Sequence, residues 1–422
     1  MPDTLAALRA VVGPPHAWLA AAGDAVDGVA PRFVAAPGSA EEVASTLRLA
    51  DEAGLTVVPR GAGTKLAWGA PPTRADIVVS TRRLDAVLEH AAGDLVVRAQ
   101  AGVPLEALQA QLAPASQWLA LDPPEPGASL GGVVATAASG PRRQRYGTAR
   151  DLLIGVSVVL ADGTLAKAGG KVVKNVAGYD LCKLFTGSFG TLGVIVETTF
   201  RLHPRPVGRC LVVADLDTSR ALGEAVRSLL QTALVPSALE LLATTESGAA
   251  GRLAVLFEGV PAGAVAQAQS AERLLARHGR SRIVQEPSLD AEWRVMTEAI
   301  GDGGVRLKLS GIVGRVPEMI DAVRAVARQH DLRFRIAGQA GLGVLGARLE
   351  SPDEAVLSEV VPELRRRLGP RAHVVIRHAP PRVKRAVDVW GDPGDALPLM
   401  TRVKQRFDPH GTLSPGRFVG GL

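Results

Sequence analysis

The sequence contains few cysteines and few aromatic residues. Only two of its 422 residues are cysteines, Cys182 and Cys210, and neither belongs to a Cys-x-x-Cys pair. A disulfide framework, or an iron–sulfur cluster held by this chain alone, is therefore not expected. Tryptophan, tyrosine and phenylalanine together make up 4% of the chain. Because rings that stack on bases are scarce and the basic residues form no stripe, we expect no nucleic-acid binding.

The sequence also lacks a long hydrophobic run. No apolar stretch approaches the roughly 18 residues that a membrane-spanning helix needs. The first residues, MPDTLAALRAVVG, carry an aspartate where a signal peptide would carry positive charge. These absences predict a cytoplasmic protein without direct membrane insertion.

The chain is instead rich in aliphatic residues and long. Hydrophobic residues make up 47% of the 422 positions, which is enough for a sizeable core and argues against disorder. A chain of this length exceeds the size at which a single core usually stops growing, so we expect more than one domain. The formal net charge of +6 suits anionic ligands or an acidic partner subunit.

Local patterns in the first third predict a small α+β subdomain at residues 30–115. Ser39 and Glu42 have capping-box spacing ahead of a helix that Gly54 ends. The short runs LTVVPR, DIVVS and DLVVRAQAG are typical of strands, and Pro104 opens a further helix.

A second α+β subdomain is expected to follow. It contains the strand LIGVSVVL, a turn at Asp162 and Gly163 that predicts a hairpin, and a final strand that Pro204 and Pro206 terminate. From about residue 207 to 385 strands and helices alternate without glycine-rich loops, which predicts a separate α+β domain. The tail after residue 395 has one more amphipathic helix.

Three glycine-rich segments, each next to a predicted strand, are candidates for ligand binding. The first, PRGAGTK, contains Gly61 and Gly63, which allow backbone N–H groups to converge on an anion. It matches neither a P-loop nor a dinucleotide-binding fingerprint, so a plain turn and a phosphate-binding loop both stay open. The second, PGASLGGVVATAASG, suits either backbone lying against a flat ligand or a small-residue helix packed on a sheet. The third is GSFGTLGVIVE.

The order of these motifs resembles a known family. PRGAGTK, PGASLGG, RYGTARDLLIGVSVVLADG, KNVAGYDLCKLFTGSFGTLGVI and FDPHGTLSPGRF occur in this order. Together they resemble the FAD-linked oxidoreductases of the vanillyl-alcohol-oxidase type, also called p-cresol methylhydroxylase (PCMH) type, and most of all the FAD-binding subunit of bacterial glycolate oxidase. The resemblance is strong over residues 28–206, good in the tail and weak between them.

The resemblance implies an α+β fold with three parts. Residues 28–206 would form a PCMH-type FAD-binding domain of two α+β subdomains. Residues 207–390 would form an α+β cap domain, and residues 391–422 would pack back on the FAD-binding domain.

The resemblance also implies where FAD would bind, in the cleft between the two subdomains. Its pyrophosphate would meet the first loop, the second segment would lie along the pyrophosphate and flavin, and the third loop would hold the adenosine side. The implied residues are Arg60, Gly61, Ala62, Gly63, Thr64, Lys65, Ser129, Leu130, Gly131, Gly132, Thr136, Gly140, Tyr146, Gly147, Gly190, Thr191, Gly193, Val194 and Ile195. Since the first loop offers no His or Cys, binding is expected to be non-covalent.

Arginines and a lysine outside these loops are weaker candidates for contact with an anion. Arg142, Arg143 and Arg145 suit either FAD phosphates, an anionic substrate or a solvated loop. Lys308, a lone cation in VRLKLSG, is either a substrate ligand or a solvent-facing strand residue. Lys308 and Arg145 are the only residues that we nominate for the reaction itself.

Acidic and histidine side chains are the weakest candidates for a catalytic or metal-binding role. Asp151 and Asp180 suit pairing with the arginines better than a general-base role. His373 and His378 lie five apart on one predicted strand and so on opposite faces, which argues against joint metal binding. We expect no metal site.

One departure from related 2-hydroxy-acid dehydrogenases bears on activity. Those enzymes carry a polar GDGNLH-type strand, whereas the corresponding stretch here is AGQAGLGVLGAR, with Leu342, Val344 and Gly346 at the polar positions. Ser414 also stands where related chains often have asparagine. Apolar side chains can neither bind a metal nor polarise a hydroxy acid.

The resulting hypothesis is the FAD-binding subunit of a glycolate-oxidase-like complex. A catalytic FAD subunit and an iron–sulfur subunit would be its partners. The substrate would be a small anionic 2-hydroxy acid such as glycolate. Through the complex, the protein could lie peripherally at the inner membrane. Two alternatives stay open: a self-sufficient FAD-dependent 2-hydroxy-acid dehydrogenase or oxidase, and a non-catalytic flavin scaffold.

Overall fold

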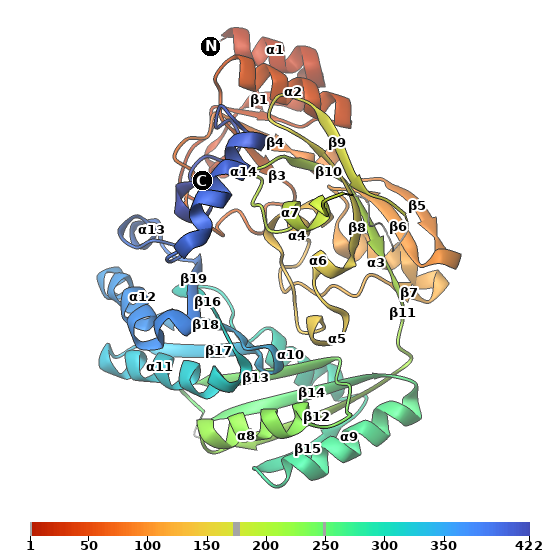
Figure 1. Cartoon of the computed structure of the whole chain (residues 1–422), viewed down its shortest axis with the longest axis vertical. Coiled ribbons are helices and arrows are strands. Elements are labelled where there is room, and N and C mark those ends of the chain that lie inside the picture. The colour runs from red at the N-terminus through yellow and green to blue at the C-terminus, as the bar shows by residue number, and fades with distance from the viewer. Residues whose placement is uncertain (1, 172–177, 248–249) are drawn as a thin grey trace. The chain divides into compact units, whose positions relative to one another are not determined.

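The computed structural model describes residues 2–171, 178–247 and 250–422. Part of the motif KNVAGYD, which contributed to the resemblance, lies outside the described residues. The chain divides into two compact units (Figure 1). The first unit comprises Met1–Ser139, Gly147–Arg205 and Asp392–Leu422, and the second comprises Gly140–Tyr146 and Pro206–Gly391. The structure thus groups residues 140–146 with the second unit, whereas the resemblance implied that they belong to the FAD-binding domain.

The first unit begins with a four-stranded sheet. Its order is β1 (Ala17–Leu19), β2 (Phe33–Ala35), β4 (Ile77–Ser80), β3 (Val57–Arg60), and β4 runs parallel to both β2 and β3. Helices α1 (Pro2–Val12) and α2 (Ala40–Glu52) share a buried aliphatic core with these strands. The predicted helix start is confirmed, because Ser39 Oγ accepts a hydrogen bond from Glu42 N at 3.1 Å.

A second, antiparallel sheet of the first unit has five strands. Its order is β5 (Val87–Ala91), β6 (Val96–Gln100), β10 (Val194–Arg201), β8 (Leu153–Val159), β9 (Leu165–Gly169). The predicted hairpin at Asp162 and Gly163 is confirmed: β8 pairs with β9, and Gly163 has a φ of 81°. Short elements surround this sheet, namely α3 (Leu105–Leu112), β7 (Gln117–Trp118), α6 (Ala149–Leu152), α7 (Leu181–Phe185) and β11 (His203–Pro204).

The second glycine-rich segment contains a helix, α4 (Leu130–Thr136), which packs on β10. A Cβ on Gly131 would lie 2.7 Å from the Cβ of Ala101, so this glycine permits close packing of α4 on the sheet. A Cβ on Gly132 would meet only Ser129 Oγ, at 3.1 Å. Of the two interpretations of this segment, close helix packing therefore applies to Gly131, while Gly132 leaves space open.

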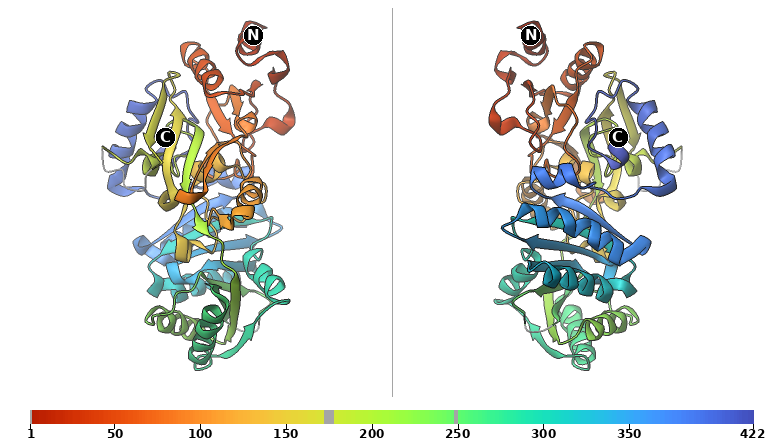
Figure 2. Two further views of the ribbon diagram at one scale, coloured as in Figure 1. Left: turned by 90° about the vertical axis from the view of Figure 1, so that its right-hand side faces the viewer. Right: turned by 90° about the vertical axis from the view of Figure 1, so that its left-hand side faces the viewer.

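The C-terminal segment, Asp392–Leu422, returns to the first unit (Figure 2). Its helix α14 (Leu397–Phe407) places Phe407 edge-to-face against Phe185 of α7, with ring centroids 5.8 Å apart. Beyond the helix, Leu413 forms a parallel bridge with Val57, so the segment lies alongside β3.

The second unit is built on one eight-stranded antiparallel sheet. The strand order is β15 (Arg280–Val284), β12 (Gly208–Leu216), β14 (Gly251–Gly259), β13 (Ala238–Thr244), β17 (Arg333–Gln339), β18 (Val344–Glu350), β16 (Val305–Gly311), β19 (Ala372–His378). The helices are α5 (Arg143–Tyr146), α8 (Ser219–Leu230), α9 (Pro261–Leu275), α10 (Leu289–Thr297), α11 (Val316–Gln329), α12 (Glu354–Leu368) and α13 (Pro381–Ala386).

The two faces of this sheet have different covers. On one face, a Cβ on Gly251 would meet both Leu222 of α8 and Leu241 of β13. On the other face, Leu242, the next residue of β13, packs in a hydrophobic cluster that contains Leu289 of α10. Because consecutive strand residues point to opposite faces, α8 and α10 cover opposite sides.

One prediction about this sheet was wrong. The strands β16 and β19 contain a bulge between Arg306 and Leu307, and the register pairs Ser310 with His373 and Arg306 with His378. Ser310 and Arg306 lie on one face of β16, so the two histidines share a face. The bulge adds a residue to one strand, which shifts the alternation that the sequence prediction assumed.

No helix among the described residues is both long enough and apolar enough to cross a membrane.

Candidate functional site

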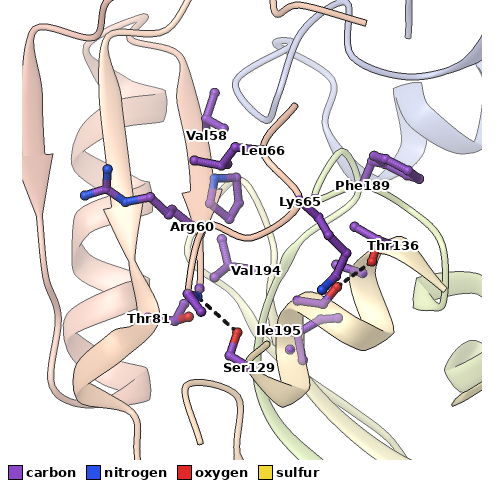
Figure 3. A pocket seen from close by; sticks show the side chains of 18 of the residues that line it. Val58, Arg60, Lys65, Leu66, Thr81, Ser129, Thr136, Phe189, Val194 and Ile195 are labelled. Carbon is purple, nitrogen blue, oxygen red and sulfur yellow. Dashed lines mark hydrogen bonds between the residues drawn. The ribbon is translucent and has the colours of Figure 1, made fainter. Parts of the chain in front are cut away.

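A cleft in the first unit brings the three glycine-rich segments together (Figure 3). Its volume, including the opening to solvent, is about 740 Å³. The segments of the cleft come from the end of β3, from helix α4 and from the start of β10, and one residue comes from the C-terminal segment. The lining residues are Val58, Pro59, Arg60, Gly61, Ala62, Gly63, Thr64, Lys65, Leu66, Thr81, Ser129, Gly131, Gly132, Ala135, Thr136, Phe189, Gly190, Gly193, Val194, Ile195 and Arg417.

The first loop, residues 60–65, lies directly against the start of α4. Ala62 N donates to Ser129 Oγ at 3.2 Å. A Cβ on Gly61 would lie 2.1 Å from the same oxygen, so no side chain fits at position 61 without a shift. Gly63 has a φ of 84°, a conformation that glycine adopts at low cost. The local geometry thus explains why both positions are glycine: close contact at Gly61 and positive φ at Gly63.

Two cations extend from the first loop. Arg60 Nη1 pairs with Asp24 Oδ1 at 2.9 Å. Burial opposes ionisation of Asp24, yet hydrogen bonds from the Ala21 N–H and from Arg60 hold the pKa of its carboxyl below the ordinary value. Lys65 is 4% exposed at its side chain, extends toward α4 in Figure 3, and lies 3.7 Å from Glu125 Oε2. This side of the cleft thus carries the Lys65 ammonium, whose charge Glu125 partly compensates.

Small residues of α4 form the facing wall. Gly132 and Ala135 line the cleft, and the Thr136 hydroxyl donates to Gly132 O at 2.7 Å. Because Gly132 has no side chain and Ala135 has only a methyl group, a flat ligand is able to approach the backbone here.

The third loop, residues 188–193, forms the remaining wall. Gly190 has a φ of 70°, and a Cβ there would lie 3.1 Å from Pro59 of the first loop's strand. The Thr191 side chain turns away from the cleft and donates to Ser188 O at 2.7 Å. Phe189, Val194 and Ile195 add apolar surface.

Most of the residues implied by the resemblance line this cleft, and some do not. Leu130, Gly140, Tyr146, Gly147 and Thr191 lie outside its lining. Leu130 is buried, and Gly147 packs so closely on Asp151 that a Cβ would lie 2.8 Å from the Asp151 Cβ.

Seven lining residues were not predicted from the sequence. Five of them, Val58, Pro59, Leu66, Ala135 and Phe189, flank or interrupt the motifs, and this adjacency was a usable signal. Thr81 and Arg417 come from distant parts of the chain. No local pattern indicated Thr81, whereas Arg417 stands in the tail motif SPGRF.

Arg142 and Arg145 are engaged within the second unit. Arg142 makes a two-point contact with the buried carboxylate of Glu258, with Nη2 to Oε1 at 2.8 Å and Nε to Oε2 at 3.1 Å. Arg145 donates to the backbone oxygen of Glu258 at 2.5 Å and stacks its guanidinium 5.4 Å from the Tyr146 ring centroid. Burial raises the pKa of the Tyr146 phenol. These contacts bind residues 140–146 to the sheet of the second unit.

Lys308 is half-buried on the middle of β16. Burial, together with the positive charges of Arg377 and Arg143, lowers the pKa of its ammonium to about 8. Across the sheet Lys308 pairs with Gly346 of β18 and Val375 of β19. The second unit thus carries a group of three cations on which an anion could be bound.

The two aspartates weighed as bases have structural roles. Asp151 accepts hydrogen bonds from the backbone N–H and the hydroxyl of Thr148, both at 2.8 Å, which caps α6. Asp180 caps α7 and pairs with Lys183. Among the residues that the structure describes, no three His, Cys, Asp or Glu side chains gather as a metal-ligand set.

The cleft of the first unit fits a flat, anionic cofactor. Gly132 leaves space open beside α4, Gly61 and Gly190 let the loops pack against Ser129 and Pro59, and Lys65 and Arg417 contribute positive charge. Apolar side chains from the third loop and β10 complete the wall. Backbone N–H groups with nearby cations suit a pyrophosphate, and small and apolar residues suit planar rings.

Comparison with known proteins agrees with this fit. Residues 31–169 match the model of the FAD-binding domain family. The fold superposes on p-cresol methylhydroxylase in its substrate-bound crystal structure with a TM-score of 0.78 at 16% identity, covering 99% of this chain and 96% of that one. The protein therefore has the PCMH-type α+β fold, and its cofactor is FAD.

Sequence relatives match either most of the chain or about half of it. The glycolate oxidase subunit GlcD of Bacillus subtilis is 26% identical over 420 residues, covering 92% of this chain and 88% of the relative. A D-lactate dehydrogenase of Archaeoglobus fulgidus is 38% identical over 225 residues, covering 51% of this chain and 49% of the relative.

Proposed function

We propose that this chain is the FAD-binding subunit of a glycolate-oxidase-like complex, which takes part in the oxidation of glycolate or a similar 2-hydroxy acid to the 2-oxo acid. A catalytic FAD subunit and an iron–sulfur subunit are the proposed partners. When bound, FAD supplies the electron-pair acceptor for oxidation of a CH–OH group. The two free cysteines, both buried, are too few to ligate a cluster, so an iron–sulfur centre would belong to a partner.

The accessory-subunit proposal is supported mainly by the residues around Lys308. The Lys308 ammonium is the proposed ligand of a carboxylate, and the neighbouring charges of Arg377 and Arg143 would add to the attraction. On β18, however, the residue opposite Lys308 is Gly346, and Val344 lies opposite Ser310. Oxidation of a hydroxy acid also needs a base for the hydroxyl proton within hydrogen-bond reach of the substrate. At these positions β18 supplies no such group, which supports anion binding without efficient chemistry by this chain alone.

One observation favours the self-sufficient dehydrogenase as a second candidate. His373 lies opposite Ser310 and so on the same face of the sheet as Lys308, one diagonal position away. His373 is exposed, and an imidazole beside a lysine is a workable pair of base and carboxylate ligand. The relatives named as a D-lactate dehydrogenase and a glycolate oxidase subunit are compatible with both candidates.

Co-purification tests the accessory role. The chain carrying an affinity tag, expressed in its own cells, is predicted to retain a second FAD protein and a protein whose absorption shows iron–sulfur charge transfer. A sample that contains this chain alone, under conditions where the complex of a related glycolate oxidase survives purification, would contradict the proposal and favour the self-sufficient enzyme.

A further inference from the structure

The end of the chain is part of the cofactor site, although the whole second unit separates it in sequence from the glycine loops. Val57 N donates to Thr412 O at 2.7 Å, and Ser414 N donates to Val57 O at 2.8 Å. The C-terminal segment therefore extends the sheet along β3, the strand that leads directly into the first loop. Two buried cations of this segment make further contacts: Lys404 with the third loop, and Arg417 with the residues that directly follow the first loop.

Lys404 of α14 joins the segment to the third loop. Its Nζ donates to Thr191 O and Leu413 O, both at 2.8 Å, and to Asp408 Oδ2 at 2.5 Å. The other donors to Asp408 are the backbone N–H groups of Thr412 and Leu413, each at 2.8 Å. Burial lowers the pKa of Lys404 and the charge of Asp408 opposes that shift. All three donors of the ammonium are used, so its position is fixed.

Thr191 is the residue through which this contact reaches the cleft. It lies between Gly190 and Gly193, and both of these line the cavity. Its hydroxyl donates to Ser188 O, and its backbone oxygen accepts the hydrogen bond from Lys404. Lys404 thus holds the third loop from behind, without lining the cleft.

Arg417 joins the same segment to the first loop. Its Nη2 donates to Leu66 O at 2.9 Å and to Trp68 O at 2.6 Å, immediately after residues 60–65. Arg417 is 3% exposed and lines the cleft. Burial lowers the pKa of its guanidinium to about 10 and the charge of Asp27 opposes the shift, so Arg417 stays positive at neutral pH.

We propose that the C-terminal segment is a cofactor clamp, in which Lys404 positions the third loop and Arg417 positions the first loop and adds positive charge to the cleft. This proposal rests on FAD as the cofactor and is independent of the substrate and of partner subunits. Because the clamp lies beyond the second unit in sequence, the FAD site is complete only when the last thirty or so residues have folded back onto the first unit.

The test measures FAD affinity in the full-length chain after removal of bound flavin. Arg417→Met removes the charge and the carbonyl contacts, whereas Arg417→Lys keeps the charge. For Lys404 the double variant Lys404→Met/Asp408→Asn is used, because replacing both members of a buried pair avoids an uncompensated charge. Arg402→Met, an exposed position on the same helix, is the matched control.

We expect both clamp variants to raise the Kd for FAD at least roughly tenfold, and the Arg402 control to leave it unchanged. Arg417→Lys should recover part of the loss. A purely structural role would lower the melting temperature of the flavin-free protein and leave the stabilisation by added FAD intact, whereas a positioning role shrinks that stabilisation. Unchanged Kd values in both clamp variants would overturn the proposal, as would an equal loss in the control. If Lys404→Met/Asp408→Asn fails to fold, the Kd values of Arg417→Met and Arg417→Lys alone test the proposal.

Discussion

Gly61 and Ser129 occupy one point of contact between the first loop and helix α4. A Cβ at position 61 would lie 2.1 Å from Ser129 Oγ, the atom that accepts the hydrogen bond from Ala62 N. Two of the three glycine-rich segments are thereby locked together at the floor of the FAD cleft.

Gly61→Ala is therefore expected to displace the first loop and to weaken FAD binding by roughly tenfold or more, which corresponds to about 1.4 kcal/mol. Flavin titration of the deflavinated protein measures the change. Gly93→Ala serves as control, because Gly93 is exposed and a Cβ there meets nothing within 4 Å. Equal affinity in the two variants would show that the first loop does not contact the cofactor.

The adjacent glycines of α4 are expected to behave differently from each other. Gly131→Ala places a methyl group 2.7 Å from the Ala101 Cβ and should destabilise the whole protein. Gly132→Leu projects into the cleft and should give a folded but colourless protein. Circular dichroism and the visible spectrum separate these outcomes. A yellow Gly132→Leu variant with full flavin content would remove α4 from the cofactor site.

The attachment of FAD is a separate prediction. Since the first loop contains neither His nor Cys, acid precipitation of the yellow protein should release all flavin into the supernatant. Flavin that remains with the precipitated polypeptide would contradict non-covalent binding.

Ser414 combines two unfavourable features close to Gly190 of the third loop. Its φ is 45°, its side chain is fully buried, and its hydroxyl has no hydrogen-bond partner among the described residues. Ser414→Gly should stabilise the flavin-free protein by about 1 kcal/mol, because glycine tolerates positive φ and leaves no buried hydroxyl. Thermal melts with and without FAD test this. If the hydroxyl contacts the cofactor, the gain disappears in the FAD-bound protein, and an equal gain in both forms would show that it does not.

Anion binding by the second unit should depend on pH through Lys308. Its ammonium, with a pKa near 8, is protonated below that pH and attracts a carboxylate. Above it the charge is lost, so the affinity for oxalate or glycolate should fall about tenfold per pH unit. Calorimetric titration between pH 7 and pH 9 measures this slope. Lys308→Met should abolish the dependence, whereas Arg328→Met, an exposed residue of α11, should keep it. A slope unchanged in Lys308→Met would show that another group binds the anion.

Glycines that the local backbone requires could be predicted from the sequence, whereas contacts from distant parts of the chain could not. Gly61, Gly63 and Gly190 were recognisable because positive φ and close backbone approach require glycine whatever lies elsewhere in the chain. Arg417 reaches the cleft from the far end of the chain, and only the folded structure shows that Leu66 and Trp68 accept its hydrogen bonds.

The burial of Lys308 and the strand register of β19 also could not be predicted from the sequence. The pattern VRLKLSG allowed Lys308 to be either exposed or enclosed, and its shifted pKa depends on Arg377 and Arg143 from other elements. Strand alternation placed His373 and His378 on opposite faces, and one extra residue at a bulge reversed that result.

The most direct test of the proposed function is the reaction of the isolated chain with substrate. The protein, purified without partners and loaded with FAD, is mixed anaerobically with millimolar glycolate or D-lactate while flavin absorbance is followed by stopped flow. Our account predicts at most slow bleaching, because the loss of a general base typically costs about 10²- to 10⁴-fold in rate. Flavin reduction complete within seconds would contradict the accessory role and identify the chain as a self-sufficient 2-hydroxy-acid dehydrogenase.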